Sequence, residues 1–281
     1  MNFNNDDQLK SYLKKESKRL GISITNTYTT FFSRILLDRV SSISFGELAV
    51  KGSFSELAHL NNMIRPITDI DLVSTKYHND PLIVLFKAMC ETNDDINYEL
   101  TDFPRQTKTG IYKIPIEARY GKIKHRISID FMELSKTLYD IDYKRIDPFF
   151  SNDTFFYIST PTYEEHFAEK LCIIAESIKD DVLNTRVKDF YDIYKLYNGK
   201  YDLDKLSYYF NKMITDRNKI NTNNLSSKHL NYKFIDSHKE LWNLMSKKYE
   251  FMDKEVEFEE AFEISKNILD EQIKKYKRKT L

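Results

Sequence analysis

Hydrophobic positions recur at two spacings along this chain, and the balance between them changes near residue 160. In the first part, stripes at helical spacing alternate with short apolar or alternating runs, which indicate strands. The predicted helices are 9–20, 25–40, 54–63 and 81–90, and the predicted strands are 45–51, 67–73, 96–100, 111–118, 123–132 and 155–158. Gly21 is expected to end the first helix, Thr25 or Asn26 to cap the second, and Gly121 to lie in a hairpin turn.

After residue 160 the pattern is helical throughout. The predicted helices are 162–178, 185–198, 203–217, 236–248 and 256–278. Pro161 lies near the start of the first of these helices, and Glu164 and Glu165 occupy its first turn, as is typical of helix N-termini. The pattern predicts an α+β protein with two domains. Residues 1–159 form a mixed sheet with flanking helices, and residues 160–281 form a helical bundle.

The composition is that of a globular protein with no overall attraction to nucleic acid. Hydrophobic residues make up 41% of the 281 residues, and the 43 Lys and Arg residues balance the 43 Asp and Glu residues. Contact with a polyanion would therefore need local basic patches. The polar N-terminus and the absence of an apolar run of about 20 residues predict a cytoplasmic protein without a membrane segment. The two cysteines, Cys90 and Cys172, lie in apolar runs and are expected to be buried thiols.

An Asp-x-Asp pattern occurs three times, at 69–71, 140–142 and 202–204. Because the chain is rich in aspartate, the pattern alone is weak. The second copy continues into a polar segment that resembles a turn, and the third resembles a helix N-cap. Only the first copy lies in a predicted strand that follows a Gly-Ser turn, so it is the candidate for chemistry.

Asp69 and Asp71 are predicted to share one face of a strand, with Ile70 and Leu72 toward the core. Two adjacent carboxylates repel each other unless a cation or a proton lies between them. Mg²⁺ prefers carboxylate oxygens together with substrate phosphates, so the pair predicts a magnesium site. The alternative is a strand end whose aspartates are solvated or act as caps.

Asp130 is the candidate for a third carboxylate. It lies on the polar side of the alternating run 126–132. With Asp69 and Asp71 it would hold two Mg²⁺ ions, which bind the attacking and leaving oxygens in group transfer. The alternative is an ordinary residue at a strand exit.

Lys51, Gly52 and Ser53 form the turn before the third predicted helix. Glycine allows the backbone to approach a phosphate, and the N–H groups at a helix start favour an anion. Ser53 adds a hydroxyl and Lys51 a positive charge. The alternative is a simple strand-to-helix turn with a solvated lysine.

Three segments, taken in order, resemble the AbiEii/AbiGii toxin family of nucleotidyltransferases. Val50–Ser53 followed by Arg65–Leu72 (RPITDIDL) resembles its Lys-Gly-Gly and Arg-x-Ser-x-Asp-Ile-Asp signature. Glu164–Leu171 (EEHFAEKL) resembles its Glu-Glu-x-x-Ala-x-Lys-Leu helix, and Lys188–Tyr194 (KDFYDIY) its Arg/Lys-Asp-x-x-Asp-x-Tyr helix. The ordered set covers about residues 45–195.

The resemblance implies a polymerase-β-like nucleotidyltransferase domain with a helical bundle, a nucleoside triphosphate as substrate, and Mg²⁺. It also implies a toxin of a toxin–antitoxin or abortive-infection system, a possible antitoxin partner, and RNA, such as a tRNA end, as acceptor. Ser53 replaces the family's second glycine. Ile67 stands where serine is common in the family, and Thr68, the next residue, is the candidate for a nucleotide-binding hydroxyl.

The later motifs add Lys170, Asp189 and Asp192 as candidates. Lys170 would contribute charge to the triphosphate. Asp189 and Asp192 share a helix face, so one of them could hold Lys170 in place. Both are also candidates for nucleotide binding. The alternative is a structural salt bridge between helices.

Two basic segments are weaker candidates for RNA contact. They are the hairpin with Lys113, Arg119, Lys122, Lys124, His125 and Arg126, and the tail 274–279. Both are also consistent with solvated surfaces.

The sequence thus predicts an enzyme that transfers a nucleotide from an NTP to an acceptor hydroxyl, with RNA as acceptor and a growth-inhibiting role. Two alternatives remain open: a nucleotidyltransferase acting on small molecules, as in aminoglycoside-modifying enzymes, and a non-catalytic nucleotide- or RNA-binding module.

Overall fold

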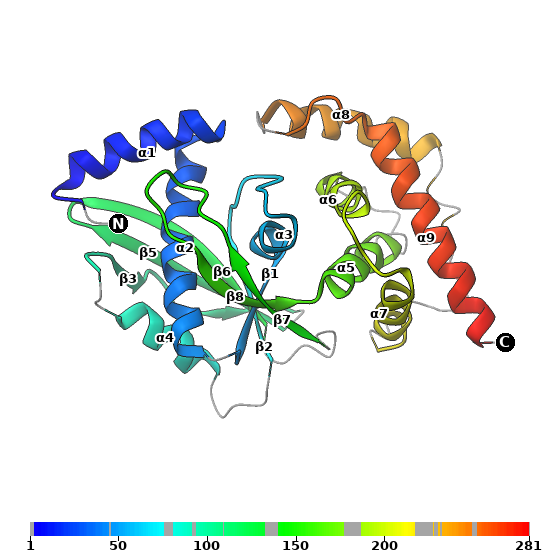
Figure 1. Cartoon of the computed structure of the whole chain (residues 1–281), viewed down its shortest axis with the longest axis horizontal. Coiled ribbons are helices and arrows are strands. Elements are labelled where there is room, and N and C mark those ends of the chain that lie inside the picture. Colours follow the sequence, from blue (N-terminus) through cyan, green and yellow to red (C-terminus); the bar gives the residue numbers. More distant parts are fainter. Residues whose placement is uncertain are drawn as a thin grey trace. The chain divides into compact units, whose positions relative to one another are not determined.

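The computed structural model describes residues 3–44, 46–75, 81–91, 94–108, 110–132, 140–176, 187–216, 227, 230, 232–248 and 252–280. The chain forms two compact units, Met1–Pro161 (unit 1) and Thr162–Leu281 (unit 2). Unit 1 contains the sheets and unit 2 is helical, so the predicted α+β class is confirmed (Figure 1). The division falls two residues after the sequence-based boundary at residue 160.

The described helices of unit 1 are α1 (Asp6–Leu20), α2 (Ile24–Ser44), α3 (Gly52–Leu60) and α4 (Pro81–Cys90). As predicted, Gly21 ends α1, in a left-handed conformation. The predicted cap of α2 was wrong. The Ser23 hydroxyl, rather than Thr25 or Asn26, lies before the first turn and accepts a hydrogen bond from the Asn26 backbone N–H at 3.1 Å. A serine just before a helix satisfies one of its otherwise unpaired N–H groups.

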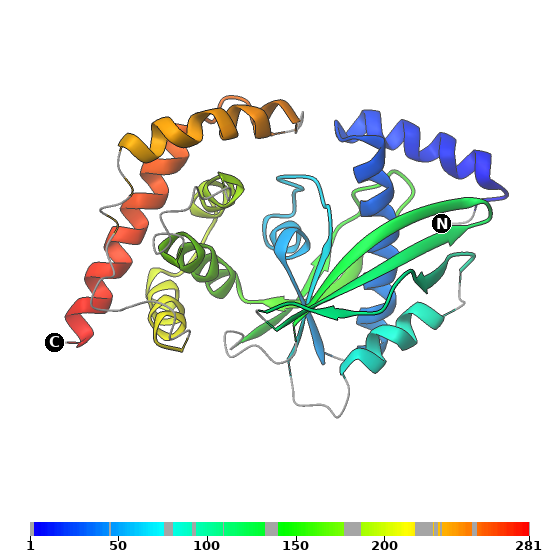
Figure 2. The same cartoon turned by 180° about the vertical axis from the view of Figure 1, so that it is seen from behind.

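The main sheet has the strand order β1-β2-β6-β5-β3, with β4 also paired to β5. Its strands are β1 (Leu48–Lys51), β2 (Ile70–Ser74), β3 (Asn97–Leu100), β4 (Arg105–Gln106), β5 (Ile111–Tyr120) and β6 (Ile123–Met132). Among the described strand pairs, β2 and β6 are parallel and the others antiparallel. The predicted hairpin at Gly121 is present as β5–β6 (Figure 2).

A second sheet pairs β7 (Ile141–Ile146) with β8 (Phe156–Pro161). The sequence pattern predicts a turn in the β7 region, and this prediction is wrong. Only the two ends of β7 are apolar, Ile141 and Ile146, and the residues between them are charged or tyrosine, so the strand lacks the apolar alternation that reveals a half-buried strand. The strand predicted at 67–73 begins only at Ile70.

The core of unit 1 lies between the main sheet and the helices. On β6, Ile127, Ile129 and Phe131 are buried, and the residues between them are not. Helix α2 runs across this core and contacts α1, α4, β1, β6 and β8 (Figure 1). Its Phe31 and Phe32 are almost fully buried. Burial of such large apolar side chains is the main favourable contribution to folding.

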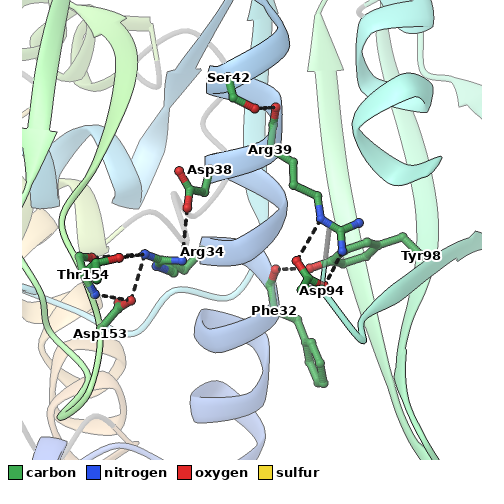
Figure 3. A network of polar contacts seen from close by, with 9 residues as sticks. All are labelled: Phe32, Arg34, Asp38, Arg39, Ser42, Asp94, Tyr98, Asp153 and Thr154. Carbon is green, nitrogen blue, oxygen red and sulfur yellow. Dashed lines mark hydrogen bonds and ion pairs between the residues drawn. The ribbon is translucent and has the colours of Figure 1, made fainter. Parts of the chain in front are cut away.

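Two buried arginines on α2 connect it to opposite sides of unit 1 (Figure 3). Arg34 lies 2.8 Å from an Asp153 carboxylate oxygen and donates to the Thr154 carbonyl oxygen at 3.1 Å. Burial raises the pKa of the Asp153 carboxyl above its ordinary value, and Arg34 opposes that rise. The pair therefore joins α2 to the segment before β8.

Arg39 connects the same helix to the other side (Figure 3). It forms an ion pair with Asp94 and donates to the Ile96 carbonyl oxygen at 2.7 Å. Its guanidinium lies 5.0 Å from the centre of the Tyr98 ring, and the Tyr98 hydroxyl donates to the Phe32 carbonyl oxygen at 2.7 Å. The arginine thereby joins α2 to the start of β3.

Unit 2 contains α5 (Tyr163–Glu176), α6 (Val187–Tyr197), α7 (Leu203–Asp216), α8 (Tyr232–Lys248) and α9 (Phe258–Thr280). Positions 177–178, 185–186 and 217 of the predicted helices lie outside the described residues. Asp202 caps α7, as predicted, by accepting from the backbone N–H groups of Asp204 and Lys205. Aromatic rings of α6, α8 and α9 pack together in the core of unit 2, among them Phe190, Trp242, Phe258 and Phe262.

The two cysteines differ. Cys172 is buried, as predicted, whereas Cys90 is exposed at the last position of α4, so the prediction for Cys90 was wrong. In the described part of the chain, no helix combines the length and the apolar character that crossing a membrane requires.

Replacing Arg39 with methionine is expected to lower the free energy of unfolding by about 2–4 kcal/mol. The substitution removes the donor to the buried Ile96 carbonyl oxygen and the cation that pairs with the partly exposed Asp94, and Arg39 itself is buried. Arg105→Met is the matched control, because Arg105 forms an ion pair with Asp102 while its side chain is 77% exposed. That change is expected to cost less than about 0.5 kcal/mol. Urea unfolding followed by far-UV circular dichroism measures both, and equal losses would contradict the assigned role of Arg39.

Candidate active site

Four charged residues form a row across four adjacent strands of the main sheet. Lys51 on β1 is the register partner of Asp71 on β2, and Asp71 is the partner of Asp130 on β6. Asp130 is in turn the partner of Lys113 on β5. Neighbouring strands lie about 4.8 Å apart, so the row brings two carboxylates side by side with a lysine on each flank.

The apolar neighbours of the two aspartates explain this arrangement. Ile70 pairs with Ile129 and Leu72 with Phe131, and all four are buried. Because side chains alternate along a strand, the residues between them point to the other face. Asp71 and Asp130 are accordingly only partly buried. The pattern that buries the core also places both carboxylates on one face.

The Gly52 turn lies directly against Asp71. β1 passes into α3 at Gly52, whose φ of +61° is in the left-handed region. A Cβ added to Gly52 would lie 2.0 Å from Oδ2 of Asp71 and 3.1 Å from its Cγ. The carboxylate therefore occupies the space that any side chain at residue 52 would need. The turn and one acidic residue of the candidate site are thus in contact.

Two buried oxygen atoms near this turn have no hydrogen-bond partner among the described residues. They are Oγ of Ser53, in the first turn of α3, and Oδ1 of Asp130. Buried polar atoms are nearly always hydrogen-bonded, so each exception requires an explanation. A carboxylate oxygen suits a hard cation such as Mg²⁺, and a hydroxyl at a helix start suits an anion. The donor set is consistent with a magnesium nucleotide.

Asp69 lies outside the strand that was predicted to carry it. It precedes β2, and the exposed Thr68 hydroxyl donates to its Oδ1 at 3.2 Å. The described residues contain no group of three or more histidine, cysteine or acidic side chains arranged to hold a metal ion. The structure thus brings Asp71 and Asp130 together, and a metal site that includes Asp69 stays a prediction.

A buried ion pair connects the segment before Thr68 to α3. Arg65 Nε lies 3.2 Å from Oε2 of Glu56, and its Nη2 donates to Oε1 at 3.3 Å. Both side chains are buried. Thr160 on β8 also donates to the Ser55 hydroxyl of α3 at 2.6 Å. No local sequence pattern predicts the Arg65–Glu56 pair, although Arg65 belongs to the RPITDIDL motif.

The basic hairpin is partly neutralised by its own surroundings. Lys113 forms an ion pair with Asp130, and Arg119 forms ion pairs with Glu99 and Glu117. His125 packs against α2, where its Nε2 lies 2.8 Å from the Thr29 hydroxyl, and burial lowers its pKa. The other three basic residues of the hairpin, Lys122, Lys124 and Arg126, are exposed.

In unit 2, Lys170 on α5 is buried against two aspartates of α6. Its Nζ lies 3.2 Å from Oδ1 of Asp189 and 2.7 Å from Oδ2 of Asp192. The expected pairing with one aspartate is present and involves both. Only 6% of Lys170, 2% of Asp189 and none of Asp192 is exposed. This contact holds α5 and α6 together, and a role of Lys170 at a triphosphate stays a prediction.

Two solved structures are similar to this chain in fold. JHP933 from Helicobacter pylori aligns with a TM-score of 0.53 at 12% identity, covering 92% of this chain and 96% of that chain. A candidate nucleotidyltransferase from H. pylori aligns with a TM-score of 0.51 at 13% identity, covering 92% of this chain and 98% of that chain. At this identity the similarity establishes the fold, which is nucleotidyltransferase-like.

The family follows from the sequence itself. The family model described as nucleotidyl transferase AbiEii toxin, type IV TA system, matches residues 34–264, so the chain belongs to this family. The resemblance drawn from the motifs is thereby confirmed. None of the curated proteins matches the sequence.

Gly52→Ala is expected to destabilise the protein more than Gly110→Ala. Both glycines have a positive φ, +61° and +84°, so alanine costs about 1–2 kcal/mol of backbone strain at either position. At Gly110 an added Cβ has no heavy atom within 4 Å, whereas at Gly52 it meets Asp71. That clash is expected to add about 1–3 kcal/mol. Urea unfolding measures the difference, and equal losses would show that Asp71 gives way at little cost.

Lys170→Met is expected to lower the free energy of unfolding of unit 2 by about 3–5 kcal/mol, because it leaves two buried carboxylates without their cation. Adding Asp189→Leu and Asp192→Leu is expected to restore most of the loss. Lys239→Met, which breaks the exposed Lys239–Glu259 pair of the same unit, is the control and is expected to cost less than about 0.5 kcal/mol. Fluorescence of the chain's single tryptophan, in α8, measures unfolding of this unit. A small loss in Lys170→Met would contradict the structural role.

Proposed function

We propose that this protein is a Mg²⁺-dependent nucleotidyltransferase that transfers a nucleoside monophosphate from an NTP to a hydroxyl group of RNA, such as a tRNA end. Its place in a family of toxin nucleotidyltransferases supports a transferase that acts as a toxin with an antitoxin partner. One observation carries the chemical part of the proposal. Asp71 and Asp130 are register partners on one sheet face, beside the Gly52 turn.

The turn supplies the groups proposed to hold the phosphates. α3 begins at Gly52, and its N-cap residue Lys51 forms no side-chain cap hydrogen bond. The first N–H groups of a helix are unpaired within the helix and attract anions. The Oγ of Ser53, for which the described part of the chain offers no hydrogen-bond partner, lies in the same turn. In the proposal these donors bind triphosphate oxygens, Lys51 adds positive charge, and Thr68 contributes a hydroxyl.

Asp71 and Asp130 are proposed to hold Mg²⁺, with Asp69 as a third ligand and two ions as the expected number. When bound, Mg²⁺ neutralises charge that develops on the phosphate oxygens. Asp130 is proposed to orient the attacking hydroxyl and to help remove its proton. This hydroxyl then attacks the α-phosphorus, and pyrophosphate leaves.

Residues outside the charged row are proposed to support binding. Lys170, held by Asp189 and Asp192, would contribute charge to the phosphates if its ammonium exchanges a carboxylate for a phosphate oxygen. The exposed basic residues of the hairpin, Lys122, Lys124 and Arg126, are proposed to contact the acceptor backbone.

Incubation with labelled NTPs, Mg²⁺ and total RNA tests the proposal, with label expected in RNA. Asp71→Asn and Asp130→Asn are expected to reduce transfer by at least about a hundredfold, since each removes a carboxylate from the charged row. Asp142→Asn and Asp204→Asn are the matched controls, because they come from the other two Asp-x-Asp patterns and are expected to retain activity.

The other outcomes separate the alternatives. Label in a small molecule rather than RNA would support a nucleotidyltransferase of the aminoglycoside-modifying kind. Nucleotide binding without transfer, unchanged by Asp69→Ala or Asp71→Asn, would support a non-catalytic module and would exclude the proposed enzyme.

A further inference from the structure

Lys113 lies at one end of the charged row and contacts a carboxylate of the candidate site. It is the register partner of Asp130, and its ammonium forms an ion pair with Oδ2 of that residue. On its other side Asp130 faces Asp71. The Lys113 ammonium therefore contacts one of two neighbouring carboxylates, and Lys51 is the register partner of the other.

The two partners of this ion pair differ in their freedom to move. The Lys113 side chain is 51% exposed, whereas the Asp130 side chain is 17% exposed and belongs to a strand paired on both sides. A half-exposed ion pair contributes little free energy, and a lysine side chain can rotate into solvent. Lys113 can thus leave Asp130, while Asp130 stays in place.

A divalent cation at Asp130 would need the negative charge that Lys113 already neutralises. Carboxylate oxygens are the preferred ligands of hard divalent cations, and an ammonium beside such a cation repels it. The other oxygen of Asp130, Oδ1, is buried and has no partner among the described residues. Lys113 therefore contacts the more accessible side of a carboxylate whose second oxygen is suited to an ion.

We propose that Lys113 is a positioning residue that competes with the divalent cation for Asp130. Its ammonium neutralises Asp130 before the cation binds and is displaced when the cation enters. The lysine thereby sets how tightly the site holds its ion. This inference rests on the cation-binding part of the proposed function, because it requires a divalent cation at Asp71 and Asp130.

Direct cation binding tests the inference without any measurement of activity. The full chain is titrated with Mn²⁺ in the absence of nucleotide, and free Mn²⁺ is measured by its electron paramagnetic resonance signal. Lys113→Met is expected to bind Mn²⁺ about five-fold more tightly than the wild type, which corresponds to loss of a half-exposed ion pair. Lys113→Arg retains the positive charge and is expected to bind with wild-type affinity.

Lys122→Met is the matched control, because it removes the same charge from the turn at the far end of the same hairpin. Its Mn²⁺ affinity is expected to equal that of the wild type. Circular dichroism verifies that each variant is folded, and Lys113→Gln replaces Lys113→Met if the latter is not.

Equal affinity of wild type and Lys113→Met, or no binding in either, would overturn the inference. So would an equal gain in Lys122→Met, because the effect would then be general electrostatics. The transfer assay is independent of this result. Nucleotide transfer with an unchanged Mn²⁺ affinity in Lys113→Met would leave the proposed function standing and remove only the inference. Tighter Mn²⁺ binding by Lys113→Met without nucleotide transfer would leave the inference standing and remove the proposed transfer.

Discussion

The parallel pairing of β2 with β6 is the constraint on which the candidate site depends. It brings Asp71 and Asp130 together from distant parts of the chain. The register is held by buried partners on the other face, Ile70 with Ile129 and Leu72 with Phe131. A slip of one residue on either strand would carry an aspartate into the core and expose an apolar side chain. The hydrophobic core therefore protects the geometry of the site.

The charges on the sheet and those in unit 2 are stabilised in different ways. On the sheet, the aspartates lie on a partly exposed face, where water and flanking lysines offset their repulsion. In unit 2, Lys170 and its two aspartates are almost fully buried, so their mutual contacts must replace solvation. The first arrangement can exchange partners at small cost. The second holds helices together, and any exchange there needs a ligand of comparable charge.

Much of this architecture could be predicted from local sequence. The alternation around Asp130 identified its strand and its face, and Gly21 and Gly121 marked a helix end and a hairpin turn. The Gly52-Ser53 turn precedes only the Asp69–Asp71 pattern, and this distinguished that pattern from the other two Asp-x-Asp patterns. These features follow from residues close together in the chain, where periodicity and turn preferences are informative.

The rest depended on contacts between distant residues. No local pattern shows that Lys113 faces Asp130, because this requires the register of β5 against β6. The burial of Arg65 with Glu56 likewise requires the loop between α3 and β2 to fold back. β7 was missed because it is a polar strand held by its pairing with β8. In each case tertiary pairing, rather than intrinsic preference, decides the structure.

The contact between Gly52 and Asp71 has an evolutionary consequence. Because the carboxylate fills the volume that a side chain at residue 52 would occupy, the two positions cannot vary independently. A lineage that loses the acid gains room for a larger residue in the turn, and a lineage that first enlarges the turn forces the acid out. The positive φ of Gly52 favours glycine whether or not the acid is kept, so a side chain at residue 52 is expected only in divergent descendants that have also lost the aspartate.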